Sequence, residues 1–225
     1  MEKYSGRMKS LKHLMHESWH EHLIPYLCNE ESNELFNKIT LDKKTNNVYP
    51  KTINVFNVFE MPLTDIKVVI LGQDPYYTKD VATGYAFGVK ENANIAPSLR
   101  NIIKEVHRTE GKGEFDKTLK SWTDQGVFLL NTALTVREGE PNSHTKIWKP
   151  FINFVFSVLN YNRSNIIFLL WGGKAKAYSS LINENHITLE SPHPSPLATG
   201  FIGNDHFNKT NKILIKNGKE PIKWI

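Results

Sequence analysis

The segment IKVVILGQDPYY, residues 66–77, decides the fold that we expect for this chain. Its first six residues, 66–71, are β-branched, apolar or long, and a short run of this kind that ends in turn residues predicts a buried strand. Gly72 ends the strand, and Asp74 follows directly before Pro75. A strand that runs into a turn rich in functional side chains is typical of a ligand-binding edge in α/β proteins.

Similar runs occur at residues 127–130 (VFLL) and 165–171 (NIIFLLW), and a weaker run at 186–189 is a candidate fourth strand. Helical patterns are expected at residues 98–109, 115–125, 147–160, 174–183 and 206–217, and an amphipathic helix at 10–28. Residues 41–51 are expected to form a surface loop, followed by a short helix near 54–59. The alternation predicts one α/β domain, with a central, mostly parallel four-stranded sheet flanked by helices on both faces.

Composition limits the possible classes of protein. The 225 residues are 40% hydrophobic and 23% charged, which is typical of a globular chain and excludes disorder. Cys28 is the only cysteine, so an intrachain disulfide and a cysteine-based zinc cluster are excluded. With neither a signal-like apolar stretch nor a membrane span, we expect a cytoplasmic protein without a membrane partner. The net charge of +5 is compatible with a polyanionic partner but does not identify one.

Side chains suited to chemistry follow the predicted strands. Pro75 restricts Asp74 to extended backbone angles and so fixes its carboxylate, although the dipeptide alone favours a structural turn over catalysis by about two to one. Asn131 follows the strand at 127–130, and its amide could read the edge of a nucleobase or cap a turn. Phe87 could stack on a base or belong to the core.

The segment SPHPSPL, residues 191–197, has proline at every second position. Three fixed φ angles make a stiff ribbon that presents His193 and two hydroxyl groups, with Leu197 at its tip. A proline-rich segment that binds a partner is the alternative, but such segments usually lie in disordered sequence. We favour a preorganised active-site loop.

One motif indicates a different chemistry. Residues 16–20, HESWH, match the HExxH pattern of zinc peptidases. We interpret the match as chance, because the third histidine of the longer signature is absent and only fifteen residues precede it. No phosphate-binding GxxxxGK[ST] or GxGxxG motif follows a predicted strand, which disfavours nucleotide chemistry.

Taken together, GQDPYY, GYAF, LLNTALTV and HPSPL resemble the motif set of family 1 uracil-DNA glycosylases, in the same order and at similar separations. The resemblance runs from about residue 48 to near residue 224. It implies a single domain over 1–225, with a variable helical segment at 1–47 and a catalytic core at 48–225. It also implies an enzyme of base excision repair that flips deoxyuridine out of damaged DNA and hydrolyses its N-glycosidic bond. The products are free uracil and an abasic site, with no lyase activity, no metal and no organic cofactor.

The resemblance assigns the catalytic roles to two residues. Asp74 matches the carboxylate that orients the attacking water and stabilises positive charge on the sugar, and His193 matches the histidine that stabilises the departing uracil anion. Uracil binding is assigned to Gln73, Tyr76, Phe87 and Asn131. Of these, Asn131 would read the uracil edge, Phe87 would stack on the base and Tyr76 would exclude the methyl group of thymine.

DNA binding is assigned to four further residues: Ser98, Ser191, Ser195 and Leu197. The three serines match positions that hold the phosphate backbone, although helix capping and turn formation would also explain them. Leu197 matches the wedge that enters the stack when the target nucleotide leaves it.

The sequence departs from the family pattern in two places. Residues 77–79 (YTK) replace the usual His-Gly-Pro, and Thr83 replaces a usual histidine, which alters the hydrogen bonds expected around the attacking water. Only Ala198 and Thr199 separate Leu197 from Gly200, about two residues fewer than usual, and the customary arginine is absent. This shortened loop predicts a shallower wedge and poorer handling of duplex DNA than of single strands.

The expected partners are uracil-containing DNA, single- or double-stranded, and a proteinaceous inhibitor. No heptad pattern indicates an obligate dimer, so we expect a monomer. Depending on the source, the enzyme would act in the cytoplasm, a nucleus or an infected host cell. Two other hypotheses remain open at this point: a DNA-binding or replication-accessory protein with a vestigial glycosylase pocket, and the zinc peptidase.

Overall fold

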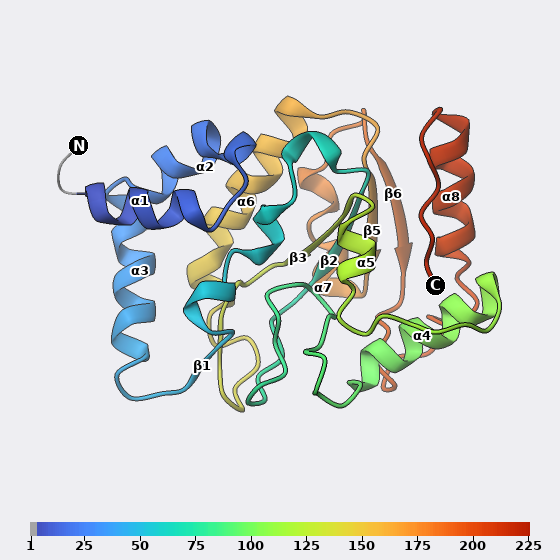
Figure 1. The fold of residues 1–225 in the computed structure, drawn as a ribbon, viewed down its shortest axis with the longest axis horizontal. Coiled ribbons are helices and arrows are strands. Elements are labelled where there is room, and N and C mark those ends of the chain that lie inside the picture. The colour runs from blue at the N-terminus through green and yellow to red at the C-terminus, as the bar shows by residue number, and fades with distance from the viewer. Residues whose placement is uncertain (1–3) are drawn as a thin grey trace.

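The computed structural model describes residues 4–225, with a four-stranded sheet at its centre (Figure 1). The strand order is β3-β2-β5-β6, and every neighbouring pair is parallel. The bounds of the strands are Val68–Gly72 (β2), Val127–Asn131 (β3), Ile167–Trp171 (β5) and Ile187–Ser191 (β6). The four strands predicted from the apolar runs are therefore confirmed, as is the α/β class.

Helices precede the sheet and connect its strands. Their bounds are Ser5–His13 (α1), His20–Leu27 (α2), Glu31–Asp42 (α3), Pro97–Glu110 (α4), Lys120–Thr123 (α5), Thr145–Asn162 (α6), Gly173–Lys176 (α7) and His206–Lys216 (α8). Short 3₁₀ turns occupy Glu17–Trp19 (η2), Thr52–Asn54 (η3), Asn57–Glu60 (η4), Leu63–Asp65 (η5) and Ser179–Leu181 (η6). Two further strands, Val48–Tyr49 (β1) and Val136–Arg137 (β4), pair antiparallel beside the main sheet.

Alternate residues of each central strand face opposite sides, so the sheet divides the apolar core into two layers. In β2, Val69 and Leu71 pack with helices α1, α2, α3 and α6, whereas Val68 and Ile70 pack with α4, α5 and α8. Strands β2, β3 and β5 are buried along their whole length, as expected for a parallel sheet covered on both faces. Among residues 4–225, no helix combines the length and apolar character needed to cross a membrane.

The N-terminal helices pack directly on the sheet. The Trp19 ring stacks on Phe128 of β3 with ring centroids 5.5 Å apart, and its indole N–H donates to the Met61 carbonyl at 2.8 Å. Trp19 is fully buried, so the segment before β1 contributes to the same core as the strands.

The single helix expected at residues 10–28 is wrong. The chain forms α1 and α2 instead, with a turn at residues 14–16 and the η2 turn between them. His16 has extended backbone angles, its N–H donates to the Phe59 carbonyl at 2.8 Å, and its Nδ1 accepts the Ser18 N–H at 3.2 Å. This cap interrupts the helix despite the apolar periodicity. His16 therefore lies outside α2, and the helical HExxH arrangement is not formed.

The helix expected at 115–125 is also largely wrong, because only Lys120–Thr123 is α-helical. The Asp116 carboxylate accepts the N–H groups of Thr118 and Ser121, both at 2.8 Å, and Leu119 has a left-handed φ of 60°. A side-chain-stabilised turn thus replaces the first helical turns.

Three other segments also differ from the prediction or refine it. The pattern at 174–183 splits into α7 and η6, and the short helix near 54–59 forms as η3 and η4. Helix α3 occupies a polar stretch where no helix was predicted.

Candidate active site

A pocket of about 160 Å³ opens at the carboxyl ends of β2 and β3, where Gly72 and Asn131 are paired in register. Open parallel sheets bind their ligands at this edge. Seven of the residues singled out from the sequence line it: Gln73, Asp74, Tyr76, Phe87, Ser98, Asn131 and His193. Segments up to 120 residues apart therefore meet at one site.

The Asp74 carboxylate is fixed by three neutral donors. Its Oδ2 accepts the Asn142 backbone N–H at 2.7 Å and the Gln73 side-chain amide at 2.9 Å, and its Oδ1 accepts the Thr145 hydroxyl at 3.3 Å. Because none of these three donors carries a charge, they orient the carboxylate without neutralising it. The negative charge of Asp74 therefore remains available to stabilise a positive charge in the pocket.

Asn142 connects the Asp74 loop to a neighbouring one. Its side-chain oxygen accepts hydrogen bonds from Gln73 at 2.7 Å and from the ammonium group of Lys174 at the start of α7. Its backbone has a φ of 67°, a left-handed angle that asparagine tolerates better than most residues. Sequence reasoning missed Asn142, Thr145 and Lys174 as site residues. Residues 140–144 (EPNSH) lie in the stretch that resembles the family, but the sequence alone does not show that this segment folds back onto Asp74.

The loop that carries Asn142 is anchored from α3. Asp42 accepts hydrogen bonds from Arg137 Nε and from His144 Nε2, both at 2.7 Å. Burial acts to raise the pKa of Asp42, but the hydrogen bonds from Arg137 and His144 hold it below its usual range. His144 is 2% exposed, and its other ring nitrogen lies 2.7 Å from the Thr135 hydroxyl. The side-chain carboxylate of Asp42, in helix α3, thus supports the loop that positions Asp74.

Asn131 presents an unused acceptor to the pocket. Its side chain is 2% exposed, and within residues 4–225 its Oδ1 has no hydrogen-bond partner. A buried oxygen left in this state costs about 1–3 kcal/mol, so a ligand N–H that reached it would be recognised. Gly72 provides the space, because a Cβ there would lie 2.3 Å from this oxygen.

His193 is held as a neutral hydrogen-bond donor. Its Nδ1 accepts the Ser195 backbone N–H at 2.9 Å, which leaves the ring proton on Nε2. Burial, together with the nearby positive charge of Lys174, lowers the pKa of His193 below its ordinary value. A neutral imidazole with its proton on Nε2 can donate to an oxygen that gains negative charge.

Two aromatic residues shape the pocket. Phe87 has a φ of 65°, and its ring centroid lies 5.6 Å from that of Trp171 and 6.2 Å from that of His193. The Tyr76 hydroxyl donates to the Phe87 carbonyl at 3.1 Å, and burial raises the pKa of Tyr76, so its ring is neutral. This hydrogen bond ties the two residues across the pocket.

The candidate DNA contacts occupy different environments. Ser98 lies in the first turn of α4 and lines the pocket, and Ser195 lines an adjoining pocket of about 330 Å³ with Lys174. Leu197 is 98% exposed at the tip of its loop. Ser191, in contrast, is 3% exposed and donates its hydroxyl to the Pro192 carbonyl at 2.9 Å, so it lies beneath the loop.

The positions that depart from the family pattern have structural roles. Tyr77 lines the pocket, is 44% exposed, and accepts the Gly139 N–H with its carbonyl at 3.0 Å. The Thr83 hydroxyl accepts the Tyr85 N–H at 3.2 Å and donates to the Gly88 carbonyl at 3.3 Å. These contacts connect the loop after β2 to the loop after β4 and close the turn that carries Phe87.

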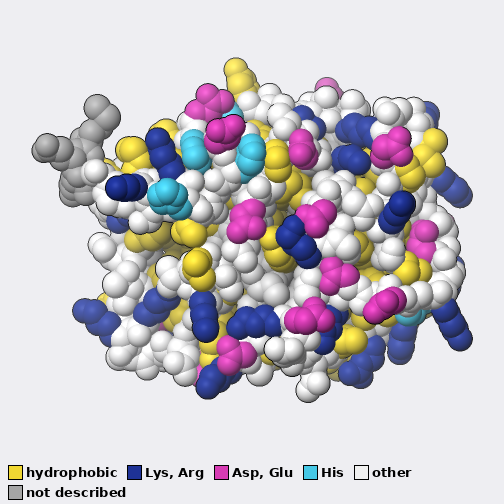
Figure 2. All heavy atoms as spheres, in the orientation of Figure 1, with side chains coloured by type: hydrophobic (Ala, Val, Ile, Leu, Met, Phe, Trp, Pro, Cys, Tyr) yellow, Lys and Arg dark blue, Asp and Glu magenta, His cyan; other side chains and the backbone are white. Residues whose placement is uncertain are grey.

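Figure 2 shows Lys and Arg side chains along the lower edge of this face, interspersed with Asp and Glu; the β6 arrow points towards that edge in Figure 1. Within the described part of the chain, no group of three or more His, Cys, Asp or Glu residues is arranged to hold a metal ion. His20 of the HExxH match instead has its Nε2 3.2 Å from the Met15 carbonyl.

Comparisons with known proteins show which family the chain resembles over most of its length. Residues 59–215 match the model of the Uracil DNA glycosylase superfamily. A relative from Buchnera aphidicola subsp. Acyrthosiphon pisum, named uracil-DNA glycosylase, is 48% identical over 185 residues, covering 79% of this chain and 84% of its own. A relative of the same name from Desulfitobacterium hafniense is 40% identical over 216 residues, covering 94% and 97%.

A solved structure of a mimivirus UNG variant in complex with UGI superposes with a TM-score of 0.89 at 29% identity, covering 95% of this chain and 90% of the other. The UNG of Nitratifractor salsuginis has a TM-score of 0.64 at 20% identity, with 84% and 88% covered, which shows a shared fold.

Proposed function

Since the chain belongs to the uracil-DNA glycosylase superfamily, we propose that the pocket at the ends of β2 and β3 carries out its reaction, with Asp74 and His193 as the catalytic pair. The protein is a DNA repair glycosylase that hydrolyses the N-glycosidic bond of deoxyuridine in DNA and releases uracil. The relatives that match most of this chain are named uracil-DNA glycosylase. The alternative, a DNA-binding or replication-accessory protein with a vestigial glycosylase pocket, is therefore not favoured.

The proposed mechanism follows from the two fixed groups. Cleavage of the glycosidic bond builds positive charge on the sugar and negative charge on uracil. The unneutralised Asp74 carboxylate would stabilise the sugar cation and orient the water that adds to C1′. The Nε2–H of His193 would donate to the uracil carbonyl oxygen as the base departs. The contact that carries this proposal is the Ser195 N–H bond to His193 Nδ1, because it fixes which nitrogen donates.

We propose that Asn131 selects uracil. Its free Oδ1 would accept the N3–H of uracil and its amide NH₂ would donate to O4. Asn131→Asp replaces that donor by an acceptor that suits the amino group of cytosine, and in its neutral form, which burial favours, its O–H can donate to cytosine N3. We expect release of cytosine to appear and release of uracil to fall by about 10–100-fold, since a matched pair contributes about 1–3 kcal/mol of discrimination.

Free bases released from single-stranded oligonucleotides, separated by chromatography, test this exchange. Asn153→Asp is a matched control, because the Oδ1 of Asn153 on α6 is also buried without a hydrogen-bond partner within residues 4–225. Unchanged uracil release by Asn131→Asp, with no release of cytosine, would contradict the edge-reading role.

We propose further that Leu197 is the wedge and that its short loop limits its reach. Extrusion of a base from a duplex requires unstacking and unpairing, which cost a few kcal/mol. In a single strand the target base is already unpaired, so this cost is smaller. We expect the enzyme to excise uracil from single strands about tenfold faster than from duplex DNA at matched salt. Leu197→Ala should slow excision from duplex DNA further and leave the single-strand rate unchanged. Equal initial rates on the two substrates would refute the limited wedge.

The remaining proposals concern organisation and partners. We propose a monofunctional enzyme without lyase activity, acting as an intracellular monomer. The shared core of Trp19 and Phe128 supports a single domain over 1–225, with 1–47 as a variable segment and 48–225 as the catalytic core.

The mimivirus UNG structure with UGI supports a proteinaceous inhibitor as a partner.

A further inference from the structure

The loop that carries His193 and Leu197 is held at both ends by one helix. On its outward leg, the Pro194 carbonyl accepts the Asn101 side-chain amide of α4 at 2.9 Å. On its return leg, the Glu105 carboxylate accepts the backbone N–H of Gly203 at 2.7 Å and that of Asp205 at 2.9 Å. Asn101 and Glu105 are four residues apart and therefore lie on one face of α4.

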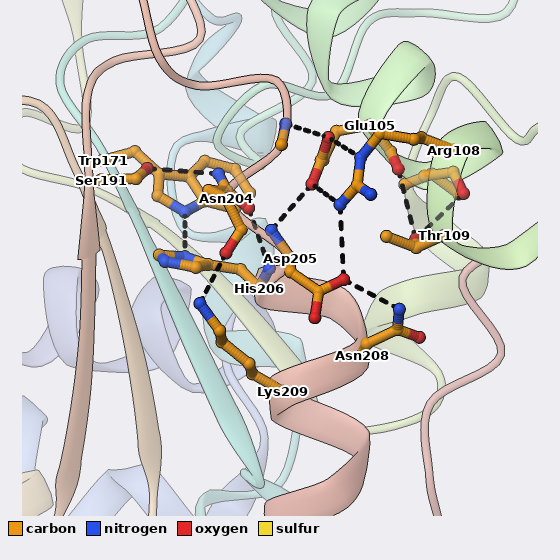
Figure 3. Close-up of polar contacts among 12 residues, drawn as sticks. Glu105, Arg108, Thr109, Trp171, Ser191, Asn204, Asp205, His206, Asn208 and Lys209 are labelled. Atoms are coloured by element: carbon orange, nitrogen blue, oxygen red, sulfur yellow. Dashed lines mark hydrogen bonds and ion pairs between the residues drawn. The ribbon is translucent and has the colours of Figure 1, made fainter.

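Glu105 is a fully buried carboxylate whose acceptors are all used. In addition to the two backbone N–H groups, it accepts Arg108 Nε at 2.9 Å and the Arg108 terminal nitrogen at 2.8 Å, as Figure 3 shows. Burial acts to raise the pKa of Glu105, but these hydrogen bonds hold it below its usual range. An ionised carboxylate at the centre of four donors is a strong and directional anchor.

The anchor holds backbone that would otherwise be unfavourable. Gly200, Gly203 and Asp205 have φ angles of 88°, 94° and 61°, so the return leg passes three times through the left-handed region. For a non-glycine residue such as Asp205 this conformation persists only where its surroundings impose it. The Asp205 side chain accepts Arg108 at 3.3 Å and Asn208 at 2.9 Å, which fixes it from a second side.

Contacts from the same segment lead to the catalytic pocket. The Asn204 amide donates to the Ser191 hydroxyl at 3.3 Å, directly before the proline ribbon. His206 Nδ1 accepts the Trp171 indole N–H at 3.1 Å (Figure 3). The Trp171 ring packs against that of Phe87, with ring centroids 5.6 Å apart. None of these contacts involves Glu105, so the ribbon and the stacking residue keep them when the hydrogen bonds of Glu105 to the return leg are weakened.

We propose that Glu105, assisted by Asn101, is a positioning residue for base extrusion: it holds both legs of the loop at residues 192–205 so that Leu197 is in place before DNA binds. A side chain that is 98% exposed has few contacts of its own to hold it, so its position depends on the legs of its loop. Glu105 itself contacts neither the pocket nor Leu197. The inference rests on the proposed wedge role of Leu197.

Glu105→Gln tests the proposal with little change in side-chain volume. One of the two carboxylate oxygens of Glu105 becomes an NH₂ group, which cannot accept a hydrogen bond. Since each oxygen accepts one backbone N–H of the return leg, the hydrogen bond to Gly203 or the one to Asp205 is lost. We expect kcat/KM on uracil-containing duplex DNA to fall at least tenfold, while kcat/KM on a single strand changes less than twofold. Glu110→Gln, the same exchange at an exposed position on the same helix, should leave both values unchanged.

Thermal melting and circular dichroism report whether the variants are folded. If Glu105→Gln does not fold, Asn101→Ala, which removes only the contact to Pro194, should lower the duplex to single-strand ratio of kcat/KM in the same direction. Equal losses on both substrates for the folded variants would overturn the proposal and leave Glu105 a purely structural residue. If Leu197→Ala leaves the ratio unchanged, the wedge role itself fails and the proposal for Glu105 fails with it. That result differs from equal losses for the Glu105 and Asn101 variants, which overturn only the positioning role.

Discussion

Uracil release should fall about 10³-fold when Asp74 is replaced by asparagine. The variant keeps the size and shape of the side chain but removes its charge. Its oxygen can still accept from Asn142 and Gln73, while its NH₂ group takes the place of Oδ1 and donates to the Thr145 hydroxyl. At about 4 Å and an effective dielectric constant near 20, a carboxylate stabilises a unit positive charge by about 4 kcal/mol. Loss of that stabilisation in an oxocarbenium-like transition state corresponds to about three orders of magnitude in rate.

Single-turnover release of uracil from a single-stranded oligonucleotide measures this effect without a contribution from base extrusion or product release. Asp116→Asn is the matched control, since Asp116 also accepts hydrogen bonds within a turn, from Thr118 and Ser121, but lies outside the pocket. The control should retain its rate per folded molecule. A loss of less than tenfold for Asp74→Asn would show that its charge does not stabilise the transition state.

The central sheet was predictable because three of its four strands, β2, β3 and β5, are buried along their whole length. A strand that must be apolar along its whole length appears in the sequence as a continuous run, and the runs at 66–71 and 127–130 differ by only one or two residues from β2 and β3. Periodicity failed at 115–125, where it predicted a helix and only Lys120–Thr123 is helical. There the Asp116 carboxylate stabilises a turn, and a single side-chain hydrogen-bond acceptor leaves no periodic signal.

The residues that line the pocket were predictable for a related reason: they follow strands, and parallel strands end at one edge. The residues that orient them were not. Asn142 reaches Asp74 across 68 positions, and Asp42 reaches His144 across 102. Glu105 appears in the sequence as one more charge on an amphipathic helix, although its side chain is fully buried. Such contacts are set by tertiary packing, which a single sequence does not reveal.

The departures at residues 77–79 leave the orientation of Asp74 intact. In this chain the Asp74 carboxylate is held by Asn142, Gln73 and Thr145, none of which lies in the altered segment. The altered loop is itself connected through the Tyr77 carbonyl to Gly139, three residues before Asn142. The change therefore affects the wall of the pocket more than the carboxylate, which is why we expect Asp74 to retain its full contribution.

His193→Ala should lower the rate of uracil release by about 10²–10³-fold, the usual effect of removing one preorganised donor to a developing anion. The effect should lie in kcat more than in KM, because the Nε2–H bond strengthens only as uracil gains charge. His186→Ala is the matched control: His186 is 7% exposed and its Nδ1 also accepts a backbone N–H, from Ile166 at 3.2 Å. Its loss should lower thermal stability and leave the rate per folded molecule unchanged.

The pH dependence provides a second test of the neutral form. Burial and Lys174 lower the pKa of His193, so the ring stays neutral as the pH falls to the ordinary value of about 6.5. Protonation would add a proton to Nδ1, where the Ser195 N–H already points, and would break that bond. The ratio of wild-type to His193→Ala rates should therefore stay constant between about pH 8 and 6.5. A ratio that rose with acidity in this range would indicate a cationic His193 as the active form.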